Sequence, residues 1–278
     1  MNRYSLAGIY TLPLLLAWNV ASKADTLSWV SLQGSGASPI TGPTSCSASD
    51  AAAASCTINF TAGSGYDEGQ GFGLASASSA FGSLSGSADL FGSPDYLGRP
   101  YPTVSGEFSA DFNDPVLITG GTGSGTVVAH FSWSDAEYIY PVVCNDCYPG
   151  GFWPSFSADI GGTSQSWSTG PTSSTTGTFD LAASFVFGST TSVGGSLSAD
   201  PTTEFLVYSG SGSDAGASAS LTLTGFSVYD SAGNLVPGAE VTPMLSPEPG
   251  AWSLCLAGLL ILVGLRRVRR PKTDTVRI

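Results

Sequence analysis

The chain has 278 residues, enough to bury a sizeable core, and a formal net charge of −12 at pH 7. Eight of its nine Lys and Arg residues lie near the two ends, so residues 25–249 have twenty carboxylates against Arg99 alone, a net charge of about −19. Such a surface repels nucleic acid, which excludes nucleic-acid binding, and the absence of lysine from this stretch excludes lysine-dependent chemistry.

Residues 1–24 have the three parts of a secretory signal peptide. Arg3 gives the positive start, the stretch from Leu12 to Trp18 is apolar, and Ser22-Lys23-Ala24 is a small-x-small cleavage site before Asp25. We expect this leader to direct export and to be removed. The alternative is an N-terminal anchor that is retained.

The composition between the two ends favours β-structure. Gly, Ser, Thr and Ala dominate, helix formers such as Glu, Lys and Gln are scarce, and turn residues recur at short intervals. The Ser-, Gly- and Ala-rich runs 75–86 and 209–220 fit either loops or strands with small side chains. A domain boundary near residues 120–125 is conceivable, but one continuous sandwich is the simpler arrangement.

Alternation of apolar and polar residues predicts half-buried antiparallel strands. Residues 126–134 are the clearest case, with Val127, Ala129, Phe131 and Trp133 on one face and Val128, His130, Ser132 and Ser134 on the other. Two further stretches repeat the pattern, with the core faces Phe108, Ala110 and Phe112, and Phe179, Leu181, Ala183, Phe185 and Phe187.

The last predicted strand changes phase partway along. Leu221 and Leu223 face one way, whereas Phe226 and Val228 continue in the other phase, and Gly225 at the switch predicts a β-bulge. Residues 230–234 then predict a turn, so residues 218–241 are expected to form a closing hairpin.

Four cysteines lie outside the C-terminal tail, namely Cys46, Cys56, Cys144 and Cys147. An even number in an exported protein predicts disulfides; three connectivities are possible, and pairing of nearest neighbours gives Cys46–Cys56 and Cys144–Cys147. A redox or zinc role for the Cys144/Cys147 pair is less favoured. Its flanks indicate a loop rather than a helix N-terminus, and the chain offers a single histidine.

His130, the single imidazole, makes a Ser-His-Asp triad formally possible, but the Gly-x-Ser-x-Gly elbow is not found in its usual context. We therefore expect a surface or edge histidine. The carboxylate pairs Asp67-Glu68 and Asp111-Phe112-Asn113-Asp114 could serve glycosidase chemistry or bind Ca²⁺, although solvated turns are the simpler interpretation. No metal site or other cofactor is predicted.

Aromatic residues are concentrated around the Cys144/Cys147 pair, and exposed rings on a β-sandwich can stack on sugars. Tyr148, Trp153 and Trp167 are the candidate ligand-binding residues, with membership of the core as the alternative.

The tail begins with Pro247-Glu248-Pro249 and continues with an apolar segment, residues 250–265. As a helix, its stretch from Ala251 to Leu265 spans about 22 Å, a marginal length for a hydrocarbon core of about 30 Å. A basic stop over 266–272 follows, with Arg266, Arg267, Arg269 and Arg270. Arginines after an apolar run hold that end in the cytoplasm, which places the preceding body on the far side of the membrane.

These tail residues, 246–272, resemble the PEP-CTERM sorting signal, which is also catalogued as an ice-binding-protein C-terminal domain. The resemblance implies export across the inner membrane of a Gram-negative bacterium. It also implies an exosortase as partner, which recognises the tripeptide, removes the tail and attaches the protein to the envelope or to exopolysaccharide. The extension Pro271–Ile278 is longer than usual. The alternative is an ordinary single-span anchor with a coincidental tripeptide.

The expected fold is all-β, with an antiparallel β-sandwich or jelly-roll-like ectodomain over 25–245 and one C-terminal transmembrane helix. We expect an exported structural protein of the envelope or biofilm matrix, anchored transiently in the inner membrane, without enzymatic activity. A carbohydrate-binding module is the alternative, followed by a polysaccharide-active enzyme. Ice binding would follow from the catalogued label alone, since regular Thr ladders are not evident in the sequence.

Overall fold

A computed structural model describes residues 25–36, 38–63, 68–93, 103–141, 153–169, 175–199, 202–203 and 213–244. In this part the chain is all-β, its strands pair antiparallel, and no helix occurs. Among these residues there is thus no helix of the length and hydrophobicity needed to cross a membrane. The predicted leader and the predicted sorting tail, with its helix over 250–265, lie outside the described residues.

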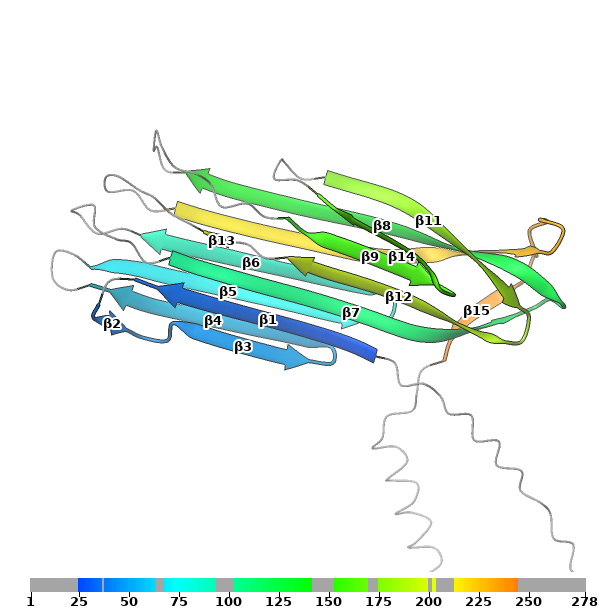
Figure 1. The fold of residues 1–278 in the computed structure, drawn as a ribbon, viewed down its shortest axis with the longest axis horizontal. Coiled ribbons are helices and arrows are strands. Elements are labelled where there is room, and N and C mark those ends of the chain that lie inside the picture. Colours follow the sequence, from blue (N-terminus) through cyan, green and yellow to red (C-terminus); the bar gives the residue numbers. More distant parts are fainter. Residues whose placement is uncertain are drawn as a thin grey trace, which may run out of the picture.

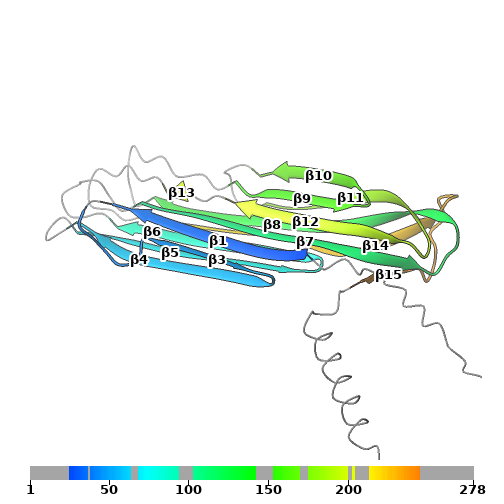
Figure 2. The same ribbon diagram turned by 60° about the horizontal axis from the view of Figure 1, so that its bottom comes forward.

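Two sheets lie face to face in a flat, elongated sandwich-like body (Figures 1 and 2). Sheet A has the order β10 (Thr163–Ser168), β9 (Ser155–Ile160), β12 (Thr190–Ala199), β7 (Thr103–Thr119), β1 (Asp25–Ser35) and β3 (Ser45–Asp50), with β13 (Thr202–Thr203) and β15 (Glu240–Pro243) also paired to β7. Sheet B has the order β11 (Thr175–Val186), β8 (Ser124–Pro141), β14 (Ser213–Asp230), β6 (Ser83–Ser93), β5 (Gly69–Ala80), β4 (Ala53–Ala62) and β2 (Ile40–Thr41). The longest strands, β8 and β14, have 18 residues each, or about 60 Å at the usual rise.

The core lies between the sheets and follows the alternation in the sequence. Its largest buried side chains are aromatic: Phe60, Phe108, Phe112, Phe131 and Phe156. The predicted core faces of β7, β8 and β11 are confirmed, because Ala110, Ala129 and Leu181 are buried with their aromatic neighbours. Outward positions of the same strands are mostly Ser, Thr and Asp.

Inward-facing glycines make room for the core phenylalanines. An ideal Cβ added to Gly86 on β6 would lie 2.1 Å from the Phe108 ring of the opposite sheet. Phe60 fits in the same way between Gly34 and Gly71, where added Cβ atoms would lie 2.1 Å and 2.5 Å from its ring. Because real carbon atoms do not approach so closely, these positions need glycine for packing.

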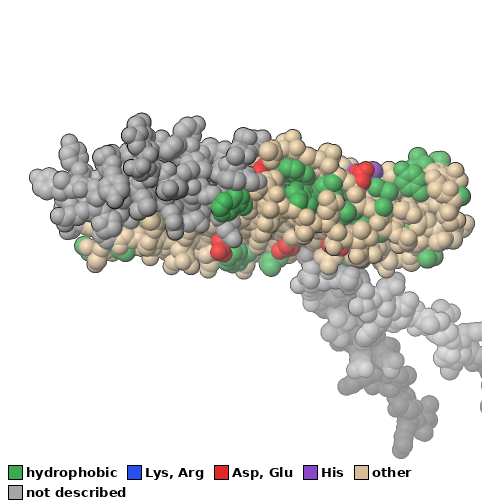
Figure 3. Space-filling model, turned by 45° about the horizontal axis from the view of Figure 1, so that its top comes forward, with side chains coloured by type: hydrophobic (Ala, Val, Ile, Leu, Met, Phe, Trp, Pro, Cys, Tyr) green, Lys and Arg blue, Asp and Glu red, His purple; other side chains and the backbone are tan. Residues whose placement is uncertain are grey.

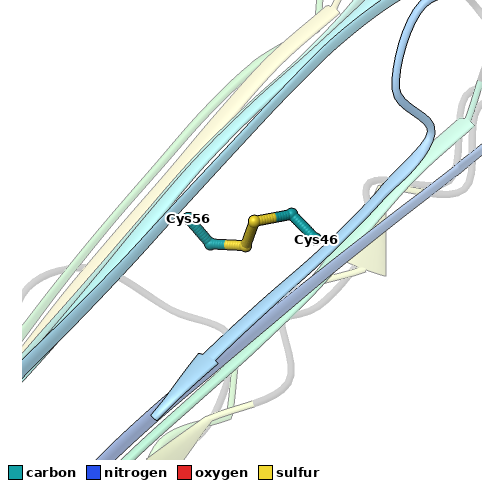
Figure 4. The surroundings of a disulfide bond; sticks show 2 residues. All are labelled: Cys46 and Cys56. Carbon is teal, nitrogen blue, oxygen red and sulfur yellow. A yellow bond between two sulfur atoms is a disulfide. The ribbon is translucent and has the colours of Figure 1, made fainter. Parts of the chain in front are cut away.

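A disulfide joins the two sheets near one edge of the sandwich. Cys46 on β3, the last strand of sheet A, is bonded to Cys56 on β4 of sheet B, with a Cα–Cα distance of 5.8 Å (Figure 4). This is one of the two predicted pairs. Cys144 and Cys147, the other pair, lie outside the described residues.

Two undecided regions of the sequence are resolved as regular structure. The run 75–86 forms the hairpin of β5 and β6, and residues 213–220 begin β14. The glycines at 120–123 form the connection between β7 and β8, which joins the two sheets.

The prediction of a closing hairpin is wrong in part. The turn after Asp230 is present and the strand phase changes at a bulge between Leu223 and Gly225, both as predicted. After the single bridge Tyr229–Leu235, however, the chain crosses over and β15 pairs with β7 of sheet A. The physical reason is that β7 has a free edge beyond Asn113, where β1 begins, and β15 fills that edge.

The interpretation of Asp111–Asp114 as a turn is also wrong. These residues lie within β7 and alternate across it, with Asp111 and Asn113 outward and Phe112 and Asp114 buried. A long strand keeps its pairing through polar positions when both neighbouring strands, here β1 and β12, supply hydrogen-bond partners.

The two ends of the described body lie next to each other. Asp25, the first residue of β1, pairs with Asn113 of β7, and Pro243 of β15 pairs with Val116 on the same side of that strand. Between them, the N–H of Met244 donates to the carbonyl of Pro115 at 2.8 Å. The first and the last described residues therefore lie at one place on β7.

Candidate functional site

Three side chains form a hydrogen-bonded line across the outer face of sheet B. Asp180 on β11 and Ser227 on β14 flank His130 on β8. The carboxylate oxygen Oδ1 of Asp180 lies 2.7 Å from His130 Nδ1, and Ser227 Oγ lies 2.8 Å from His130 Nε2. The histidine is thus on the surface as predicted, but on an inner strand of the sheet and with two partners. In Figure 3 the chain's histidine, shown in purple, lies at the surface beside an acidic side chain.

The strand register places these three residues together. Asp180 is directly opposite His130, and on the other side His130 faces Gly225. The extra residue at the bulge moves the end of β14 by one position, so Ser227 faces outward while its neighbours Phe226 and Val228 turn toward the core. Without the bulge, the phase of β14 set by Leu221 and Leu223 would point position 227 inward.

A shallow groove lies on the outer face of sheet A, with a volume of about 710 Å³. Residues of β1, β3, β7, β9 and β12 line it, including Leu27, Asp50, Asp111, Asn113, Ser157, Asp159 and Ser196. Gly194 has no side chain, and the carboxylate of Asp159 lies over it, because an added Cβ would come within 2.1 Å of Oδ2. Partial burial raises the pKa of both Asp111 and Asp159 above the ordinary value. The groove therefore combines hydroxyl, amide and carboxyl groups with exposed Leu27.

A second hollow, of about 480 Å³, lies on the outer face of sheet B and is lined almost entirely by small residues. Serine hydroxyls from neighbouring strands bond to one another across it, in the pairs Ser76–Ser87, Ser78–Ser85 and Ser134–Ser220, at 2.7–2.8 Å. These contacts leave many of the hydroxyls internally satisfied. We assign no ligand to this surface.

The predicted ligand-binding aromatics separate into different environments. Trp153 is 55% exposed and stands just before β9. Trp167 packs inward, with its ring centroid 4.4 Å from that of Phe179 and 5.4 Å from that of Phe156. Tyr148 lies outside the described residues. Of the two that the structure describes, Trp153 has the exposure that stacking on a ligand requires.

The other predicted sites are only partly covered by the structure. Glu68 is exposed, while its neighbour Asp67 lies outside the described residues, as do the sorting tripeptide and the arginines of the basic stop. Within the described ranges, no three His, Cys, Asp or Glu side chains are grouped so that they could hold a metal ion.

Sequence reasoning named His130 but missed its partners. Asp180 is 50 residues away in the sequence and Ser227 is 97 residues away. The signal that could have found Ser227 was present in the predicted bulge, which fixes the face of every residue after Gly225. Comparison with protein-family models, curated proteins and solved structures gives no match for the chain.

Proposed function

We propose that this protein is exported and held at the cell envelope or in an extracellular polysaccharide matrix, where its β-sandwich has a structural role. The leader directs export, and the PEP-CTERM-like tail anchors the chain in the inner membrane until an exosortase removes it.

The observation that supports this proposal best is where the body begins and ends. β1 starts at Asp25, directly after the predicted cleavage site, and the described body ends at Met244, three residues before Pro247. Because Asp25 and Met244 lie at one place on β7, removal of leader and tail takes none of the described strands from either sheet. A body of this kind can be processed at both ends after folding.

The disulfide and the charge agree with an extracellular location. A disulfide between two sheets persists in an oxidising compartment, whereas cytoplasmic thiols are kept reduced. The described residues contain no Lys or Arg, so the body has little attraction for the anionic membrane from which it would be released.

The test is to express the chain in cells with and without an exosortase and to measure the mass of the product. We expect tail removal only with the enzyme, and we expect Glu248→Ala to keep the tail and remain in the inner membrane. Glu240→Ala, which removes an exposed carboxylate of β15, is the matched control and should be processed normally. Equal processing of the Glu248→Ala variant and the parent would contradict the proposal.

A role as a carbohydrate-binding module is the second candidate, and the outer face of sheet A favours it. Trp153 is exposed and Pro154 buried, so Trp153, Ser155, Ser157 and Asp159 alternate onto the same outer face. Trp153 stands two residues before β9 and four residues before the groove residue Ser157, about 13 Å away if this stretch is fully extended. Several linked sugars could therefore stack on Trp153 while their hydroxyls bond to the groove.

Glycan-array binding tests this second candidate. Binding should be lost with Trp153→Ala and weakened with Asp159→Asn, whereas Trp167→Phe, a change inside the aromatic cluster, should leave it unchanged. Arrays that stay blank for the correctly folded parent would rule the role out.

A further inference from the structure

When the imidazole of His130 is neutral, hydrogen-bond chemistry sets where the protons of the line Asp180–His130–Ser227 lie. An ionised carboxylate can only accept, so His130 Nδ1–H donates to Asp180. In the neutral imidazole Nε2 then has the lone pair, and it must accept from the hydroxyl of Ser227. The serine therefore points its proton at a base that is itself oriented by a carboxylate, which is the arrangement of an activated nucleophile.

The surroundings leave room for a substrate. The side chains of His130 and Asp180 are 35% and 62% exposed, and Ser227 is partly buried. An added Cβ at Gly225, opposite the imidazole, would meet no atom within 4 Å. An open site on a flat sheet can reach an acyl group attached to a large molecule. A narrow pocket would exclude such a substrate.

The charge of the body selects the class of substrate. Residues 25–249 have a net charge of about −19, and the described part has no Lys or Arg to pair with an anionic group. Anionic esters would be repelled, whereas neutral carboxylic esters would not.

From this geometry we infer that Ser227 is the nucleophile of an acyl-transfer site for neutral carboxylic esters. Ser227 Oγ forms a bond to the ester carbonyl carbon while its proton passes to His130 Nε2. The bond from carbon to the alcohol oxygen then breaks, and the alcohol leaves with the proton from His130. Water, which gives a proton to His130, attacks the acyl-serine and releases the carboxylic acid, and the proton returns to Ser227.

Asp180 is a positioning residue in this scheme. It does not touch the substrate, but it holds the ring so that Nε2 faces Ser227 and stabilises the imidazolium that forms. The inference is independent of the proposed export, because it needs only the folded body. It goes beyond the proposed structural role.

The test is labelling of the folded, full-length protein with a fluorophosphonate, in which Ser227 displaces fluoride from phosphorus. We expect one adduct per chain, mapped to Ser227 by peptide mass, and none with Ser227→Ala. Ser132→Ala removes another outward hydroxyl, two residues from His130 on β8, and should be labelled at the parent rate. Thermal melting checks that each variant is folded.

The His130 and Asp180 variants separate chemistry from folding. General-base assistance is typically worth about 10² to 10⁴-fold, so His130→Ala should lower the rate of 4-nitrophenyl acetate hydrolysis by about 100-fold or more. Asp180→Asn should reach the same final extent of labelling about tenfold more slowly, the effect of losing one charge-assisted hydrogen bond. If Asp180 had only a structural role, Asp180→Asn would lower the final extent of labelling and leave the labelling rate of the folded fraction unchanged. An unlabelled parent, or equal labelling of parent and Ser227→Ala, would overturn the inference.

Discussion

The close contact between Gly86 and Phe108 gives a sharp test of how the two sheets pack. A Cβ at position 86 would lie 2.1 Å from Cδ2 and 2.2 Å from Cε2 of the Phe108 ring. Ordinary contact needs about 3.4 Å or more, as the dispersion minimum for carbon atoms indicates. Phe108 is 1% exposed, so its ring cannot move into solvent. Gly86→Ala therefore forces the sheets apart or the ring out of its preferred rotamer.

Overpacking of this kind typically costs about 1–3 kcal/mol. For a body of this size, each kcal/mol lowers Tm by about 2–4 °C, so differential scanning calorimetry should show a fall of roughly 2–12 °C. Ser85→Ala is the matched control on the outer face of the same strand, where it removes an exposed bond to Ser78, and its Tm should stay close to the parent value.

The double variant Gly86→Ala/Phe108→Leu tests the cause. If the clash is with the ring, the smaller side chain relieves it, and the double variant loses less stability than the sum of the two single changes, with a coupling of about 0.5–3 kcal/mol. Additive effects, or an unchanged Tm for Gly86→Ala, would refute this account of the packing.

Three further predictions concern other parts of the body. Replacing Cys46 and Cys56 by Ala lowers the free energy of unfolding by about 2–3 kcal/mol in urea titration, because a ten-residue separation no longer restricts the unfolded chain; an unchanged midpoint would speak against the bond. Burial raises the pKa of Asp111 and Asp159 in the folded state. Their ionisation therefore costs stability above the folded pKa, so Asn at either position raises Tm at pH 7, and the gain fades as the pH falls toward 3.8. Hydrogen bonds lower the pKa of Asp230, so Asp230→Ala speeds amide exchange in the following turn above pH 3.8, and the difference disappears as the pH falls through the lowered pKa.

Local patterns in the sequence were sufficient to predict the buried faces of several strands and the position of the bulge. Alternation identified the buried faces around Phe108 and Phe131, and the change of phase at Gly225 located the bulge. Spacing alone left three disulfide connectivities open, and the structure selects Cys46–Cys56 because β3 and β4 lie opposite each other at one edge.

Contacts between distant strands could not be predicted in the same way. The pairing of β15 with β7 in the opposite sheet is a property of the assembled sheets that no single segment shows. The same is true of Ser227, whose hydrogen bond to His130 depends on the register of β8 and β14 and on the bulge between them. Asp111 looked like part of a turn because polar clusters often mark turns, but pairing on both sides keeps β7 extended.

The most direct measurement for the account is the intact mass of the protein from its own cells, with and without a thiol reductant. We predict a chain that begins at Asp25, ends close to Pro249 and gains the hydrogens of at least one reduced disulfide on treatment. A reduced chain in the cytosol that still begins at Met1 and ends at Ile278 would contradict export and processing at both ends.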